Sequence, residues 1–125
     1  MQSPLVMAAL DITFRGMTPS PSVEVAIHHW VDRLEQVYGR IHRCAVVLEL
    51  PHHHHRRGNR FHVRVDIAVP GREIVVSHDS ARGDHDNAYV ALADAFRAAR
   101  RRLADHAQVR RGGPRHRAAL ASIGV

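Results

Sequence analysis

Alternating apolar and polar positions in four segments of the chain predict four β-strands. The alternation is clearest over residues 60–69, where every second side chain is apolar, and residues 7–15 show a weaker form of it. Residues 41–50 and 72–78 are rich in β-branched and apolar side chains. A Pro-Gly turn signal separates the last two segments, so we expect them to form an antiparallel hairpin.

Apolar residues at helical spacing over residues 23–38 predict a first helix. Ser20 occupies the helix-capping position, and Pro21 follows at the first helical position, where its missing N–H costs nothing. Gly39 is the expected end of this helix.

Helical spacing returns after residue 87 and predicts a second helix over about 87–106, with Asp86 able to cap it. A Gly-Gly-Pro sequence at residues 112–114 breaks any helix that reaches it. We therefore expect one α/β domain over residues 7–107, followed by a basic, flexible tail over 108–125.

The predicted order is strand, helix, strand, strand, strand, helix. A strand–helix–strand opening favours a right-handed crossover between two parallel strands. The two helical stripes need one apolar sheet face to cover, and the alternating strands supply it. We therefore predict an α+β fold, a two-layer sandwich with a four-stranded mixed sheet and both helices on one face.

Length and composition fit this single domain, since the chain has 125 residues and an apolar content of 45%. No apolar run approaches 18 residues, and no basic region precedes a hydrophobic run at the amino terminus, so we expect neither a membrane span nor a secretory signal. The expected compartment is the cytoplasm. The single cysteine, Cys44, excludes an internal disulfide and a multi-cysteine zinc site.

Charge is distributed unevenly along the chain. All 18 basic residues are arginine. The segment before Asp94 has 10 arginines and 10 acidic residues, whereas the segment from Asp94 onward has 8 arginines and two acidic residues. Arginine binds phosphate through a planar fork, so a polyanion such as nucleic acid is the favoured partner. The alternative is a solubilising tail and a compositional preference for arginine.

The second helix presents several of these arginines to solvent. If its apolar stripe faces the core, Arg101 points directly away from it, Arg97 shares that outer surface, and Arg100 and Arg102 flank it. Asp94 and Arg97 can form a local pair, but two acidic residues cannot neutralise all the arginines of this segment. The pattern indicates phosphate binding without base readout.

The aromatic residues favour a folded RNA over a single strand, because single-strand readers stack bases on exposed rings. Phe14 and Phe61 are predicted on the core side of their strands. Trp30, Tyr89 and Phe96 fall on the buried helical stripes. No stacking platform is therefore expected.

The run His52, His53, His54 and His55 is a weak candidate for a metal site. Adjacent histidines in a loop do not define a tetrahedral site, so a solvated loop that contacts phosphate when protonated is favoured. Cys44 is predicted to pack inside a strand, and the sequence has no glycine-rich phosphate loop. We expect no enzymatic activity, no cofactor and no small-molecule substrate.

Several segments in a fixed order resemble the ribosome hibernation-promoting factor family, also called ribosome-associated translation inhibitors or sigma-factor modulation proteins. The resemblance covers about residues 9–111 and is carried by Ile12–Gly16, Ser20–Ser22, Arg40–Cys44, Phe61–Ile67, Val69–Val76 and Ala95–Leu103. The histidine run falls where this family has a variable, often histidine-rich loop.

This resemblance implies a fold like the double-stranded RNA-binding domain with an added first strand. It also implies binding to the small ribosomal subunit between head and body, where messenger and transfer RNA otherwise lie, so that translation is blocked in stress or stationary phase. Long members carry a further carboxy-terminal domain that joins two ribosomes, and we expect this chain to act as a short form. Its basic residues are arginine alone, where the family mixes lysine and arginine.

With this resemblance, the sequence predicts rRNA contacts by arginines of the second helix and by weaker candidates on the open face of the sheet. They are Arg97, Arg100, Arg101, Arg102, Arg110 and Arg111, and more weakly Arg15, Arg43 and Arg64. Two alternatives stay open: a general double-stranded RNA or DNA binder, and a metal-binding protein that uses the histidine run. The oligomeric state is also open.

Overall fold

The computed structural model describes residues 9–51, 61–79 and 87–111. Its elements follow one another in the predicted order. They are β1 (Ala9–Arg15), α1 (Pro21–Val37), β2 (Arg43–Glu49), β3 (His62–Val69), β4 (Arg72–Asp79) and α2 (Ala88–Arg111).

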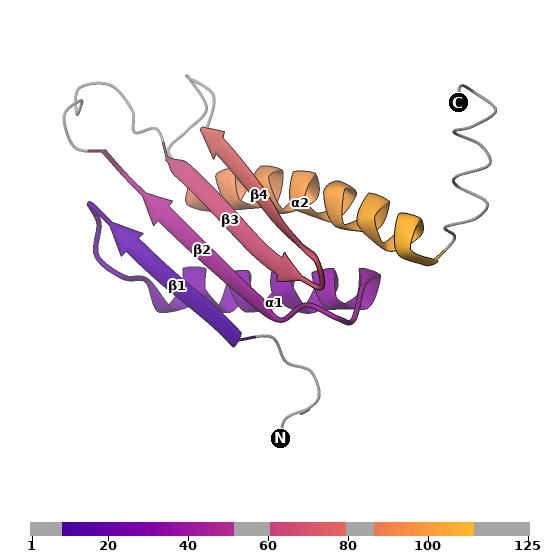
Figure 1. Ribbon diagram of the computed structural model, residues 1–125. Helices are drawn as coiled ribbons and strands as arrows, with labels where there is room; N and C mark the ends of the chain where they lie inside the picture. The colour runs from indigo at the N-terminus through magenta and orange to yellow at the C-terminus, as the bar shows by residue number, and fades with distance from the viewer. Residues whose placement is uncertain (1–8, 52–60, 80–86, 112–125) are drawn as a thin grey trace.

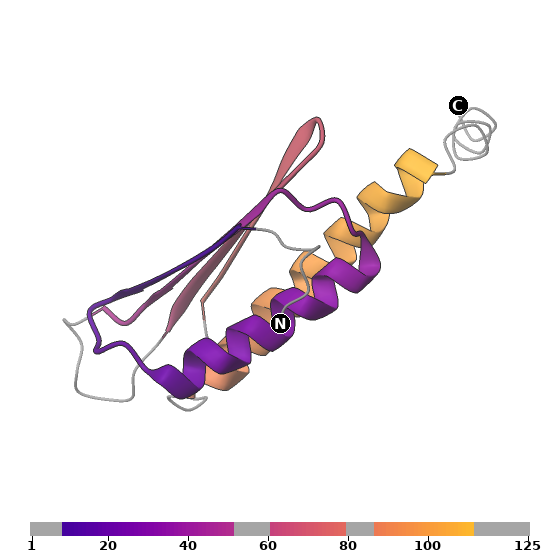
Figure 2. The same cartoon turned by 90° about the horizontal axis from the view of Figure 1, so that it is seen from below.

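The four strands form one mixed sheet in the order β1-β2-β3-β4 (Figure 1). β1 pairs with β2 in parallel, while β2 with β3 and β3 with β4 are antiparallel. Seen from below, the sheet forms one layer and α1 and α2 form the other (Figure 2). The predicted α+β sandwich is therefore confirmed, including the parallel first pair and the closing hairpin.

The first helix begins as the sequence predicts but ends differently. The Val23 N–H donates to the Ser20 hydroxyl oxygen at 3.3 Å, and Pro21 follows the cap. At the other end, Tyr38 is the capping residue and has an extended backbone with φ −152°. Among the described residues only Gly16 and Gly71 have positive φ, so Gly39 does not end the helix through a left-handed conformation.

The second helix differs from its prediction at both ends. Asn87 caps it, because its side-chain oxygen accepts the Tyr89 N–H at 2.9 Å, and Asp86 lies outside the described residues. The helix continues past the expected end at about residue 106 to Arg111. Ala107, only 2% exposed, extends the buried stripe, and no helix-breaking residue comes before 112. Residues 108–111 of the expected tail are thus helical, whereas 112–125 lie outside the described residues.

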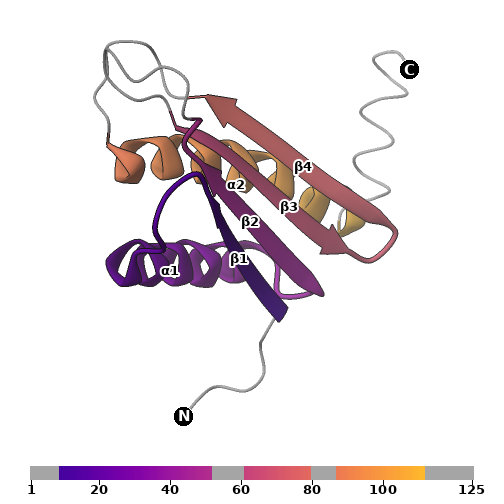
Figure 3. The same ribbon diagram turned by 90° about the vertical axis from the view of Figure 1, so that its left-hand side faces the viewer.

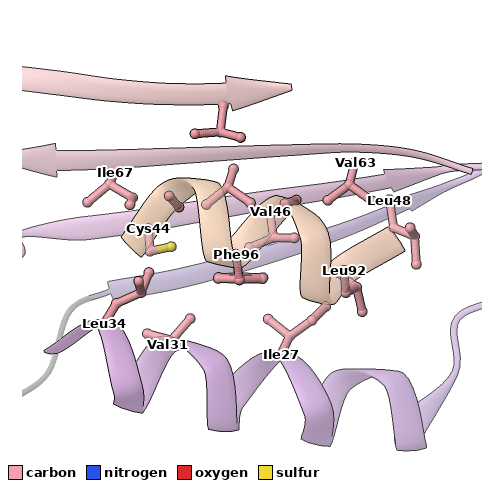
Figure 4. Close-up of a cluster of buried hydrophobic side chains, with 14 of the residues drawn as sticks. Ile27, Val31, Leu34, Cys44, Val46, Leu48, Val63, Ile67, Leu92 and Phe96 are labelled. Atoms are coloured by element: carbon pink, nitrogen blue, oxygen red, sulfur yellow. The ribbon is translucent and has the colours of Figure 1, made fainter. Parts of the chain in front are cut away.

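The core lies between the sheet and the two helices (Figure 4). Side chains from every second position of β2 and β3 meet the apolar stripes of both helices, and the central ones are fully buried. Phe96 of α2 stacks on Trp30 of α1 with ring centroids 5.7 Å apart, which links the helices above the sheet. Packing this sheet face under two helices leaves the opposite face open.

Cys44 is completely buried in β2, as predicted. Burial, together with smaller contributions from the carboxylates of Asp66 and Glu35, raises the pKa of its thiol from 9.0 to about 12. Between pH 9 and 12 the unfolded chain loses this proton before the folded chain does, so stability falls as the pH rises through that window.

We expect native Cys44 to react with a disulfide reagent at pH 8 at least about 100-fold more slowly than the unfolded chain. In the folded chain, burial keeps the thiol protonated and prevents the reagent from reaching the sulfur. Absorbance of the released aromatic thiol, recorded with and without guanidinium, measures the two rates. This is the only cysteine in the chain, so the signal has one source. Equal rates in the two conditions would contradict the buried assignment.

Candidate nucleic-acid interface

The outer surface of α2 carries the arginines that the sequence predicts there. Arg97, Arg100 and Arg101 are all exposed, while the neighbouring Phe96 and Ala99 are fully buried. The Arg97 guanidinium lies 3.4 Å from a carboxylate oxygen of Asp94, and its side chain is still 61% exposed. Within the described part of the chain, Arg100 and Arg101 have no carboxylate partner.

Asp94 connects this surface to the sheet. Its other carboxylate oxygen lies 3.5 Å from Nε2 of His78 in β4, while the first accepts from Arg97. One carboxylate therefore serves two basic groups, and it cannot neutralise the arginines further along the helix.

The Arg102 side chain points toward the sheet. Its guanidinium donates to the backbone carbonyl oxygen of Val75 at 3.0 Å, across 27 residues of sequence. Val75 belongs to β4, which is an edge strand of the sheet, so Arg102 satisfies a carbonyl that no other described strand adjoins. A guanidinium has five N–H donors, and this bond leaves the others available.

Arg110 and Arg111 form the end of α2, and their side chains lie outside the described part of the structure. Their predicted contact with rRNA stays a prediction. The same holds for the histidine run at residues 52–55, which lies outside the described ranges. Among the described residues, no group of three or more His, Cys, Asp or Glu side chains could hold a metal ion.

The two helices run parallel in matching register. Contacts near the start, middle and end of the pair join residues that are 67, 66 and 68 positions apart in sequence. They are the Ser22 and Tyr89 hydroxyl groups at 3.0 Å, the stacked Trp30 and Phe96 rings, and the perpendicular Tyr38 and His106 rings.

This register places Arg33 of α1 opposite Arg100 of α2. Arg33 is exposed, and its guanidinium carbon lies 5.1 Å from the centre of the Trp30 ring. We call Arg33, Arg97, Arg100 and Arg101 the arginine surface. Sequence reasoning missed Arg33, because it counted that residue within the neutral first part of the chain. Its position three residues after Trp30, at the margin of the apolar stripe, was the available signal.

The weaker candidates on the open sheet face have acidic neighbours. Arg43 lies 3.4 Å from Asp11, and Arg64 lies 3.4 Å from Asp66. Arg15 stands opposite Glu49 in the β1–β2 register. The strand registers place five carboxylates on this face against three arginines, namely Asp11, Glu49, Asp66, Glu73 and Asp79. The open face therefore carries more acidic than arginine side chains, whereas the arginine surface lies on the helix layer.

The aromatic residues follow their prediction with one exception. Phe61 and Phe96 are buried, and Phe14 and Trp30 are half-buried against the core. Tyr89 is 47% exposed, so its predicted place on the buried stripe is wrong. It lies on the flank of α2 that faces α1, where its hydroxyl can reach Ser22. The exposed ring is on a helix, and the sheet still offers no row of rings for base stacking.

The sequence profile of the family described as "Sigma 54 modulation protein / S30EA ribosomal protein" matches residues 10–111. The chain belongs to this family. The match confirms the resemblance to ribosome-associated factors, and it spans every element from β1 to α2.

Solved structures support the fold of this S30EA family member. A ribosomal subunit interface protein from Coxiella burnetii has a TM-score of 0.64 at 14% identity, over 78% of this chain and 96% of that one. The N-terminal domain of Protein Y from Thermus thermophilus has a TM-score of 0.61 at 12% identity, over 80% of this chain and 99% of that one. No protein of curated function matches in sequence. Neither described helix is long and apolar enough to cross a membrane.

Arg102 and Arg101 make a matched pair for testing the edge contact. We expect Arg102→Ala to lower the free energy of unfolding by about 1 kcal/mol, because the Val75 carbonyl loses its hydrogen bond. Arg101→Ala, one residue away without a described partner, should stay within about 0.5 kcal/mol of the parent chain. Urea denaturation measures both. A similar loss in the two variants would contradict a structural role specific to Arg102.

Proposed function

We propose that this chain binds the small ribosomal subunit through rRNA phosphates and occupies the channel for messenger and transfer RNA. It thereby inhibits translation in stress or stationary phase. The observation that carries the proposal is the arginine surface, four exposed arginines of which only Arg97 has a carboxylate within ion-pair distance among the described residues, on a member of a ribosome-associated family.

Elementary electrostatics supports phosphate as the ligand. A guanidinium is charged at every physiological pH and matches the geometry of a phosphate oxygen pair. Arg33 and Arg100 hold facing positions on two packed helices, so an RNA backbone that lies across α1 and α2 can contact both. Arg97 and Arg101 lie one helical turn apart on α2 and continue the row along that helix.

The arrangement favours recognition of RNA shape over sequence. Phosphate contacts fix the position of a protein on RNA without reading bases. The Trp30 ring is engaged within the protein, with Phe96 stacked on it and Arg33 above it. A rigid α/β body held by phosphates needs no chemistry to inhibit translation, because occupying the channel excludes the RNAs that would use it.

Family membership and similar folds make the ribosome the favoured polyanion. The two similar solved proteins are described as a ribosomal subunit interface protein and as a domain of Protein Y. Together with the S30EA family profile, they support a ribosomal target over a general nucleic-acid duplex.

Charge reversal on the arginine surface tests the proposal. We expect Arg97→Glu, Arg100→Glu and Arg101→Glu together to abolish co-sedimentation with small subunits at physiological salt and to relieve inhibition of translation in vitro. The slope of log affinity against log salt should fall by about three, one unit for each lost phosphate contact.

The control is a triple variant of the open sheet face. Arg15→Glu, Arg43→Glu and Arg64→Glu change the net charge by the same amount, so a nonspecific charge effect would weaken binding equally. We expect this control to retain most of its binding. Undiminished binding by a folded α2 variant would overturn the proposal, and full competition by bulk duplex RNA would point to a general RNA binder instead.

A further inference from the structure

The two edges of the sheet differ in what satisfies their outward-facing backbone groups. β1 and β4 are the outer strands, at opposite sides of the sheet (Figure 3). At the β4 edge, Arg102 satisfies the carbonyl of Val75. Within the described residues, the only strand beside β1 is β2.

The hydrogen bonds at the two ends of β1 show which backbone groups face outward. The Ala9 N–H donates to the His42 carbonyl at 3.3 Å, and the Arg15 carbonyl accepts the Leu50 N–H at 2.9 Å. The backbone groups of successive residues point to opposite sides of a strand. The odd-numbered residues therefore bond towards β2, and the even-numbered residues direct their N–H and C=O groups away from the sheet.

The outward groups belong to Leu10, Ile12 and Phe14. An unpaired row of this kind is a template for another strand. Their side chains are only half-buried against the core, so apolar surface on the helix side of β1 is also left partly uncovered. The edge thus offers backbone hydrogen bonds and apolar contact together.

We infer that β1 pairs antiparallel with β1 of a second copy of this chain, with Thr13 at the two-fold axis. The two four-stranded sheets then form one continuous sheet. In this register Asp11 faces Arg15 of the second copy on the open face, and the symmetry forms the same pair twice. The interface is self-complementary in charge.

Backbone geometry allows this register. It places Ile12 opposite Phe14 of the second copy, and both are residues whose backbone groups face outward, so they form hydrogen-bonded pairs. Thr13 meets its own copy in a non-hydrogen-bonded pair, where side chains approach most closely and threonine pairs are favourable.

Neighbouring registers match the charges less well. Moving the axis to Ile12 places Asp11 opposite Thr13 and Arg15 opposite Ala9, so neither charge has a partner directly across. Moving it to Asp11 places two carboxylates opposite each other, which is destabilising. The charge pattern of β1 selects the register centred on Thr13.

This inference is independent of the proposed function. The edge of β1 uses the open face and backbone of the sheet, whereas the arginine surface lies on the helix layer. A chain that does not bind ribosomes could still pair through β1, and a ribosome-binding chain could be monomeric.

The experiment is sedimentation velocity of the full chain from micromolar to millimolar concentration at low salt, where we expect a reversible dimer. Asp11→Arg and Arg15→Asp each create two like-charged contacts, so each single variant should dimerise at least about tenfold more weakly than the parent. Arg64→Asp makes the same charge change on the same face away from the edge, and its dimerisation should be unchanged.

Mixing the two edge variants restores both opposite-charge pairs, so native mass spectrometry should show the mixed dimer in excess over either homodimer. Circular dichroism of each variant checks folding, and recovery in the mixture itself requires folded partners. A parent chain that stays monomeric at millimolar concentration overturns the inference. A dimer that both single variants leave intact, or a mixture without mixed dimer, overturns the β1 register.

Discussion

Burial of a single sheet face under two helices is the constraint on which the rest of this molecule depends. Every second residue of β2 and β3 enters the core, and the Trp30–Phe96 stack joins the helices over it. Three contacts hold α1 and α2 parallel and in register from their first turns to their last. Because the helices cannot rotate without exposing these apolar stripes, the direction of each arginine on the outer surface follows from the packing of the core.

The same constraint places the arginine surface and the acidic open face on opposite sides of the molecule. The open sheet face holds more carboxylates than arginines, and two of its three arginines are paired at 3.4 Å. On the helix layer, Asp94 is the one carboxylate in the described chain within ion-pair distance of the arginine surface. The core thus decides both which residues face outward and which of them find an opposite charge.

Much of the fold could be predicted from the sequence because its signals are local. Strand alternation, the Ser20-Pro21 helix start and the Pro-Gly turn each act within a few residues, and the parallel first pair follows from strand–helix–strand order. The features that sequence reasoning missed depend on contacts between distant segments. Arg33 joins the candidate interface through the register of two helices, and Arg102 finds a carbonyl 27 residues away. Tyr89 lies at the edge of the apolar stripe of α2, so the exposure of its ring depends on where α1 lies.

The position of the core explains why the carboxylates of the open face do not pair with the arginines of α2. An ion pair needs its two groups within about 4 Å, whereas the carboxylates of the open face project from the side of the sheet opposite the helices, with the core between. The excess carboxylates of the open face therefore cannot turn to meet the arginines of α2, and salt screens surface charges over about 8 Å. Within the described residues no carboxylate lies within ion-pair distance of Arg33, Arg100 or Arg101, so these guanidinium groups are available to another molecule. A phosphate backbone suits them best, because its charges repeat along a line as the exposed arginines do along α2.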